Sequence, residues 1–376
     1  MQDFDEYLVA GEPGKRERAY GWVTAIGLQD VDGLKVSKYL LDVAKRNIEG
    51  EISGVEARQI IDEYYETKLG RDEPEPEDAE EADRVSARIV SIINAPGFRI
   101  SPEYYIGLHK RIFEGVFSHA GQIRDVELTK REWVLNGDSV EYELSCMIEK
   151  SLAYDFDKER EFKYKGLSED AFIKHFASFI SGIWQIHPFR EGNTRVAALF
   201  AIKYLQSMRY DVTNDLFAEK SWFFRNALVR ANYVNIKLNV DKTQIPLEEF
   251  FKVLIFGYDI ELRNRYLRIG YEHGSQYAEA VGNMHRDDVG INVGIKSSDV
   301  GLNSLKSRLS CDPRFTETEM QVADAIFENN KITARELSSI ANVTVRQIER
   351  IIASLKDKVG LRREGARKNG RWVFGE

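Results

Sequence analysis

The chain has 376 residues, of which 43% are hydrophobic, and this size predicts two or three domains with substantial cores. Its net charge of -8 gives no global indication of nucleic-acid binding, and no stretch is apolar enough to predict a membrane span. The two cysteines form no CxxC or Cys/His cluster, which excludes a zinc site. The N-terminus is acidic and does not resemble a signal peptide. We therefore expect a cytoplasmic protein.

The first 70 residues predict a small helical unit. Apolar residues recur with helical spacing from Val36 to Ala44, Gly50 interrupts that pattern, and Ser53 is placed to cap a second helix. A strongly acidic segment follows, with eight Asp or Glu residues and no basic one between positions 72 and 83. Because it also contains proline, we expect a solvated linker.

Dense helical patterns continue from about residue 84 to 260. Within them, residues 125–138 show partial strand alternation and an Asn-Gly-Asp turn, which predicts a β-hairpin or flap. Ser168 is placed to cap a later helix, which ends at His187 because the proline after it cannot continue a helix. Arg195 opens the next helical pattern.

The loop between these two helices, His-Pro-Phe-Arg-Glu-Gly-Asn-Thr-Arg at 187–195, combines several groups that suit phosphate chemistry. A Gly-Asn-Thr segment at a helix N-terminus offers free N–H groups and the positive end of the helix dipole to an anion. His187 can serve as a base, Glu191 as an oxygen ligand for a divalent cation, and Arg195 as a phosphate contact. Each residue alone has a structural interpretation, such as a Glu191–Arg195 surface pair, but together they predict phosphoryl or nucleotidyl transfer.

This loop, with Ile186 before it, resembles the Fic motif His-x-Phe-x-(Asp/Glu)-Gly-Asn-(Gly/x)-Arg-x-x-Arg, and the resemblance extends over residues 85–260. It implies an enzyme that transfers AMP from ATP to a Ser, Thr or Tyr hydroxyl of a protein, self-modification included. By resemblance, His187 deprotonates the hydroxyl and Glu191 holds Mg²⁺ at the α- and β-phosphates. The implied phosphate-binding residues are Gly192, Asn193 and Thr194, which line an anion hole, and Arg195, which binds the β-phosphate. Phe189 packs into the core and fixes the loop.

The resemblance also gives the predicted flap a role, since it implies that this segment holds the target protein by strand pairing. The flap residues are Thr129, Lys130, Arg131, Glu132, Trp133 and Val134. Two positions depart from the family pattern. The second motif arginine falls at Ala198, which removes a γ-phosphate contact, and Thr194 replaces the commoner glycine. Transfer of a phosphoryl or another nucleotide-derived group therefore remains an alternative.

The first 70 residues resemble the antitoxin-like helical segment that accompanies many Fic proteins. In that segment, a Ser/Thr-x-x-x-Glu-Gly motif places a glutamate against the second motif arginine and blocks the γ-phosphate site. The aligned residues here are Leu28, Asp32 and Gly33, and the arginine is replaced by Ala198, so both halves of that salt bridge are changed. We expect the segment to pack on the Fic core and Asp32, the inhibitory candidate, to obstruct ATP weakly or not at all. The alternative is a docked segment without a regulatory role.

The last part of the chain has the form of a helix–turn–helix. Thr344 is placed to cap its second helix, and a basic turn between two short apolar stretches suggests a two-stranded wing. This part resembles the winged helix of bacterial regulators, which implies DNA binding, with protein docking as the alternative. The DNA-binding candidates are Arg346, Gln347 and Arg350 on the second helix and Arg367 and Lys368 in the wing.

The sequence therefore predicts a mainly α protein, with a Fic helical bundle that carries a β-hairpin flap and a C-terminal winged helix-turn-helix domain. A DNA-binding regulator with an inactive Fic core is the alternative function, which Ala198 suggests and the intact His187 and Glu191 disfavour. The predicted divisions are an antitoxin-like segment (1–70), an acidic linker (71–84), the Fic catalytic domain (85–265), a connector (266–312) and the winged helix-turn-helix (313–376).

Overall fold

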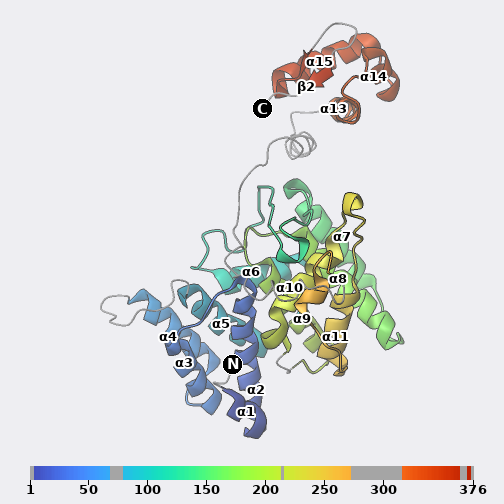
Figure 1. Ribbon diagram of the computed structural model, residues 1–376. Helices are drawn as coiled ribbons and strands as arrows, with labels where there is room; N and C mark the ends of the chain where they lie inside the picture. Colours follow the sequence, from blue (N-terminus) through green and yellow to red (C-terminus); the bar gives the residue numbers. More distant parts are fainter. Residues whose placement is uncertain (1–3, 68–78, 213–215, 272–315, 365–370, 374–376) are drawn as a thin grey trace. The chain divides into compact units, whose positions relative to one another are not determined.

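The computed structural model describes residues 4–67, 79–212, 216–271, 316–364 and 371–373. The chain divides into two compact units, Met1–Val293 and Gly294–Glu376, and each unit has its own hydrophobic core. In the first unit, the N-terminal helices lie on one side and the helices between residues 148 and 256 on the other (Figure 1).

Two of the N-terminal helices match the pattern that the sequence predicts. Ser37 accepts a hydrogen bond from the N–H of Leu40 at the start of α3, and Gly50 ends this helix in a left-handed conformation. Ser53 and Glu56 form a capping box at the start of α4. The elements of this part are α1 (Asp5–Ala10), α2 (Pro13–Gly27), the 3-10 helix η2 (Leu28–Asp32), α3 (Lys38–Glu49) and α4 (Gly54–Glu66).

Helix α5 (Ala79–Asn94) corrects the prediction of an acidic linker at 71–84. The part of that linker before residue 79 lies outside the described residues, but residues 79–84 are helical. Asp83 is buried, and its carboxylate accepts hydrogen bonds from the Ser37 N–H (2.9 Å), the Ser37 hydroxyl (2.5 Å) and the Tyr65 hydroxyl (2.7 Å). A buried carboxylate is tolerated when its oxygens are satisfied in this way. Asp83 therefore fastens α5 to the N-terminal helices.

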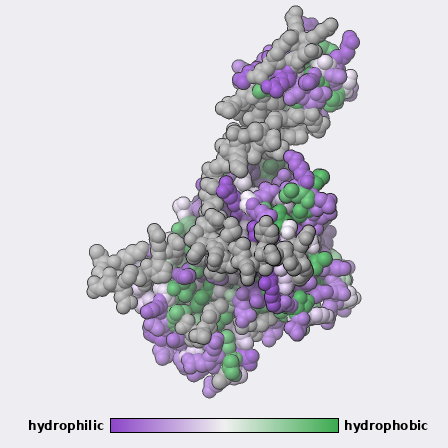
Figure 2. All heavy atoms as spheres, viewed as in Figure 1, coloured by the Kyte–Doolittle hydropathy of each residue, from purple (hydrophilic) through white to green (hydrophobic). Residues whose placement is uncertain are grey.

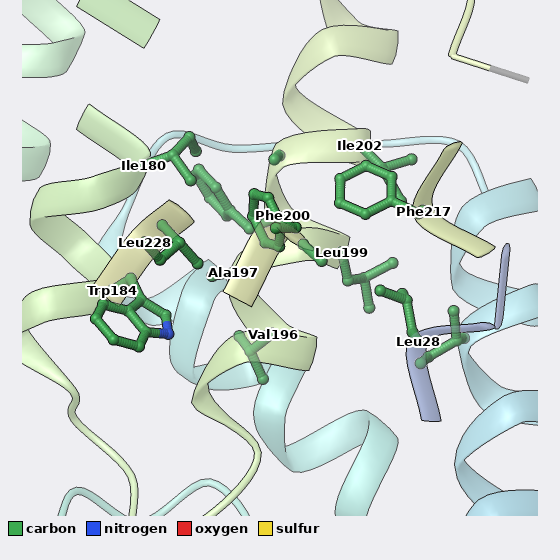
Figure 3. Packing of buried hydrophobic residues seen from close by; sticks show 14 of the residues in the cluster. Leu28, Ile180, Trp184, Val196, Ala197, Leu199, Phe200, Ile202, Phe217 and Leu228 are labelled. Carbon is green, nitrogen blue, oxygen red and sulfur yellow. The ribbon is translucent and has the colours of Figure 1, made fainter. Parts of the chain in front are cut away.

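Helix α9 (Asn193–Ser207) lies within the core of the first unit, and all its residues from Asn193 to Leu205 are buried. Such a helix needs apolar partners on every side. Figure 3 shows α9 packed between α8 (Glu169–Ile186), α10 (Leu216–Asn232) and η2, with Trp184, Leu228 and Leu28 among the contributing side chains. The other elements of this unit are α6 (Pro102–Phe113), η3 (Trp133–Leu135), η4 (Ser145–Met147), α7 (Ile148–Glu161), η5 (Ile236–Leu238), α11 (Ile245–Phe256) and η6 (Asn264–Leu267).

The predicted β-hairpin at 125–138 is wrong. The segment is a loop that contains the 3-10 helix η3, and the described residues form a sheet only in the second unit. Val134 and Leu135 are adjacent and both buried, whereas a strand would direct them to opposite faces. The Ile269 N–H donates to the Val134 carbonyl (2.9 Å), so the start of the predicted connector packs on this loop.

The second unit contains three helices and a two-stranded antiparallel sheet among its described residues. Capping boxes begin all three helices, at Thr316, Thr333 and Thr344. Trp372 is buried on the second strand, and its indole N–H donates to the Ile332 carbonyl (3.0 Å). The elements are α13 (Glu317–Glu328), α14 (Ala334–Ile340), α15 (Val345–Val359), β1 (Arg362–Glu364) and β2 (Arg371–Val373).

The DNA-binding candidates of this unit lie on the exposed side of α15 or outside the described residues. Arg346, Gln347 and Arg350 are exposed, and the Gln347 side chain also accepts the Thr344 N–H (2.9 Å) in its capping box. Arg367 and Lys368 belong to the part of the chain that is not described. The winged-helix assignment and DNA binding stay predictions.

Among the described residues, none of the helices combines the length and the apolar composition that crossing a membrane requires. In the view of Figure 2, hydrophilic residues cover most of the described surface and hydrophobic residues form scattered patches.

Candidate active site

The candidate site is the loop that joins α8 to α9, and two left-handed residues define its ends. His187 ends α8 with φ 50° and ψ 58°, a conformation that non-glycine residues rarely adopt and that often occurs at functional positions. Gly192 (φ 74°) precedes α9. A Cβ on Gly192 would lie 2.3 Å from Cε2 of Phe113, so both backbone conformation and space require glycine here.

A buried arginine holds the end of α8. The Arg124 guanidinium donates to the carbonyls of His187 (2.7 Å), Ile186 (3.4 Å) and Glu143. The backbone N–H of Arg124 donates to the Pro188 carbonyl (2.8 Å). A cation is favourable at this position because the unpaired carbonyls of a helix C-terminus carry partial negative charge. Arg124 therefore positions the backbone of the candidate base.

The side chains of Asn193 and Thr194 shape the loop from within. The Asn193 amide donates to the Phe189 carbonyl (2.7 Å) and accepts the Phe189 N–H (3.0 Å), so this side chain is engaged with the loop itself. The Thr194 hydroxyl accepts the indole N–H of Trp184 (3.0 Å), a bond that glycine at this position could not form. No described side chain caps the N-terminus of α9, which leaves backbone N–H groups of its first turn for an anion.

Phe189 is buried, as the family resemblance implied, and it stacks on the ring of His109 with 3.8 Å between centroids. His109 Nδ1 accepts the Gly121 N–H (2.8 Å), which leaves the proton on Nε2 to donate to the Glu191 carbonyl (3.1 Å). Burial lowers the pKa of His109 to about 3. A neutral His109 thus supports the loop through its stacking and both ring nitrogens.

His187 itself has the state of a general base. Its Nδ1 lies 3.2 Å from the Trp184 carbonyl, so Nδ1 carries the proton and Nε2 carries the lone pair. Burial, followed by the nearby Lys130 ammonium, lowers the pKa of His187 well below its usual value. Nε2 is buried and has no hydrogen-bond partner among the described residues, and the ring of Tyr142 stacks on the imidazole with 3.9 Å between centroids.

Arg195 is bound by residues from the N-terminal part of the chain. Its guanidinium forms ion pairs of 2.8 Å with both Asp32 and Glu81, and it donates to the Gln29 side chain (3.1 Å). The salt bridge of the antitoxin-like motif is absent because position 198 is alanine, but Asp32 has other arginine partners. Its carboxylate contacts the first motif arginine and also Arg225 of α10, 3.5 Å away.

The predicted flap residues divide between the surface and the site. Thr129 and Arg131 are exposed, and Trp133 is half-buried. Lys130 lies 3.6 Å from the Glu191 carboxylate, and the buried Glu132 pairs with Arg225 at 3.0 Å. Val134 is buried as well. Of the six residues proposed to hold a target, Glu132 and Val134 therefore face the interior of the protein.

Comparison with known proteins agrees with this geometry. Residues 99–205 match the model of the Fic/DOC family. This chain contains a Fic domain. A probable protein adenylyltransferase of Sinorhizobium fredii, y4lH, is 30% identical over 129 residues, which make up 34% of this chain and 63% of that protein. The chain thus matches less than two thirds of the length of this relative.

The Fic domain has one carboxylate in its loop suited to hold Mg²⁺. No group of three or more His, Cys, Asp or Glu side chains gathers as a metal site among the described residues. Mg²⁺ does not require such a cage, since it is often bound by one or two carboxylates together with substrate phosphates. Glu191 fits that pattern because its side chain is 25% exposed and its ion pair with Lys130 is long at 3.6 Å.

Sequence reasoning missed several side chains that form the candidate site: His109, Arg124, Tyr142, Trp184 and Arg225. Arg124 had a signal, because it lies just before the predicted flap and within residues 85–260, over which the resemblance extends. His109 lies between the apolar residues Leu108 and Ile112, where a histidine is not distinguished from a core residue. Arg225 lies outside the matched residues 99–205 and reaches the site only through the tertiary fold.

Proposed function

We propose that the Fic domain transfers AMP from ATP to a Ser, Thr or Tyr hydroxyl of a protein, this chain included. The Fic family match and the probable adenylyltransferase relative support this activity. The observation that carries it is the neutral His187, whose Nε2 lone pair has no partner among the described residues and lies in the loop before the uncapped N-terminus of α9. A base and an anion-binding backbone in one loop suit nucleotidyl transfer.

In this reaction, His187 Nε2 takes the proton of the target hydroxyl while its oxygen attacks the α-phosphorus of ATP. The new O–P bond leaves AMP on the target, and the bond to the β-phosphate breaks with release of pyrophosphate. The N–H groups at the start of α9 bind the phosphate oxygens, and Arg124 keeps the carbonyl of His187 in place. Mg²⁺ bound to Glu191 would neutralise charge on the phosphates.

We further propose that the described structure is a restrained state of this enzyme. Arg195, the phosphate contact of the motif, has Asp32, Glu81 and Gln29 as partners, so phosphate must displace them. The imidazole of His187 is also covered, with only 2% of the residue exposed. The N-terminal part therefore acts as a built-in inhibitor, whereas the sequence led us to expect that Asp32 obstructs ATP weakly or not at all.

The test uses the purified chain, its Asp32→Ala variant and its Asp32→Ala/His187→Ala variant. Each is incubated with Mg²⁺ and ATP labelled on the α- or γ-phosphate, with and without cell lysate. We expect α-label on protein from the Asp32→Ala variant and none once His187 is also replaced. If protein is labelled from the γ-phosphate alone, the reaction is phosphorylation and not AMP transfer. If protein is labelled from neither position, the result would support an inactive core.

A further inference from the structure

Arg225 is a buried cation that the Fic motif does not contain. It lies on α10 and is only 3% exposed. One terminal nitrogen lies 3.0 and 3.3 Å from the two carboxylate oxygens of Glu132, and the other lies 3.5 Å from Asp32. The Glu132 carboxylate fixes the orientation of the guanidinium, and its second terminal nitrogen faces the same carboxylate that Arg195 binds.

The Asp32 carboxylate is therefore shared between two arginines. Arg195 binds it at 2.8 Å and Arg225 at 3.5 Å, from α9 and α10 respectively. Burial alone would raise the pKa of Asp32, but Arg195, Arg225 and Lys130 together lower it, so this carboxylate is an anion in a positively charged site. Guanidinium groups bind carboxylates and phosphates with the same hydrogen-bond geometry. A place that holds Asp32 between two arginines is consequently suited to a phosphate group.

The motif itself supplies only one arginine to this place. Position 198 is an alanine, and Arg190 is turned to the surface, where it pairs with Asp125 at 2.6 Å. A polyphosphate that extends beyond the first turn of α9 thus has Arg195 as its motif partner. The additional guanidinium that the described residues place at Asp32 is that of Arg225.

We propose that Arg225 binds the phosphates of ATP beyond the α-phosphate and supplies the cation that is absent at Ala198. In the described structure Asp32 occupies this phosphate position. The inference rests on the proposed function for the identity of the ligand, a nucleoside triphosphate. It makes Arg225 a residue that distinguishes ATP from AMP, because only ATP carries the phosphates that reach it.

The experiment measures binding of ATP and of AMP by calorimetry in the full chain with Asp32→Ala, which removes the competing carboxylate. We expect Arg225→Gln in this background to weaken ATP binding about 10- to 100-fold, the usual effect of losing a charged hydrogen bond. AMP binding should not change. Arg230→Gln, which makes the same charge change on the same helix, should leave both affinities unchanged. If Arg225→Gln lowers the affinities for ATP and AMP equally, or lowers neither, the assignment is overturned.

Removal of Arg225 leaves Glu132 buried without its partner, so a second variant guards against misfolding. Arg225→Lys keeps a charge beside Glu132 but lacks the planar guanidinium, and we expect it to weaken ATP binding less than Arg225→Gln while AMP binding is unchanged. If the Arg225→Lys variant binds ATP as tightly as the chain with Asp32→Ala alone, the result would count against the proposal. Thermal unfolding checks that each variant is folded.

Labelled AMP transfer is measured separately. Arg225-dependent ATP binding without transfer would reject the proposed function alone, and transfer with Arg225-independent ATP binding would reject this inference alone.

Discussion

At the residue scale, Gly192 combines a left-handed backbone with direct contact to Phe113. We expect Gly192→Ala to abolish transfer and to lower the free energy of unfolding by about 1–3 kcal/mol, because the new Cβ both strains the backbone and displaces the ring. Gly257→Ala is the matched control, since Gly257 has a similar φ of 67° and an added Cβ there would meet no described atom within 4 Å. Activity assays and urea unfolding measure the two effects. If both substitutions act equally, contact with Phe113 is not the cause.

His109 gives the protein a pH-dependent stability. Its pKa is about 3 in the folded protein, below the 6.5 of an unperturbed histidine, so the unfolded chain binds the proton first as pH falls. Stability from this residue is complete above pH 6.5 and decreases from there toward pH 3, by about 1.4 kcal/mol per pH unit. Urea unfolding at about pH 7, 6 and 5 should show a shallower decrease for His109→Gln than for the parent chain. Parallel pH profiles would contradict a neutral buried His109.

At the element scale, the contact between the N-terminal part and α9 predicts that loss of Asp32 activates the enzyme. Asp32→Ala removes one of the two carboxylates bound to Arg195, so phosphate meets less competition and the rate of AMP transfer should rise about 10-fold or more, as expected for one buried charge pair. Asp42→Asn on α3 is the control for a charge change in the same segment. A rate below that of the parent would mean that Asp32 assists the reaction.

Local signals predicted elements better than they predicted contacts between elements. The caps at Ser53, Ser168 and Thr344 were correct because the capping hydrogen bonds join residues three positions apart. The hairpin and linker predictions failed for a different reason. Glu132 is held inward by Arg225, and Asp83 by Ser37 and Tyr65, which are partners distant in sequence. The motif likewise identified His187 but gave no indication that Arg195 is bound by Asp32 and Glu81.

At the scale of the whole molecule, two separate hydrophobic cores predict that the two units unfold in separate steps. Trp372 belongs to the core of the second unit and donates to the Ile332 carbonyl. We expect Trp372→Ala to lower the free energy of unfolding of the second unit by about 3–5 kcal/mol and so to lower the Tm of one calorimetric transition. The Tm of the other transition should not change. A single transition that shifts as a whole would show instead that the units unfold together.

Trp184 gives this protein a natural optical probe of its own loop. Its indole N–H is bonded to Thr194, its ring lies edge-on to His187 with 5.3 Å between centroids, and the residue is only 1% exposed. The fluorescence of an indole depends on its solvent exposure and on neighbouring imidazole, so entry of nucleotide or release of the N-terminal part should change the emission of Trp184. The chain has five tryptophans, and the difference between the spectra of the parent and of Trp184→Phe isolates this signal. Opening of the loop can thus be timed in the unlabelled protein.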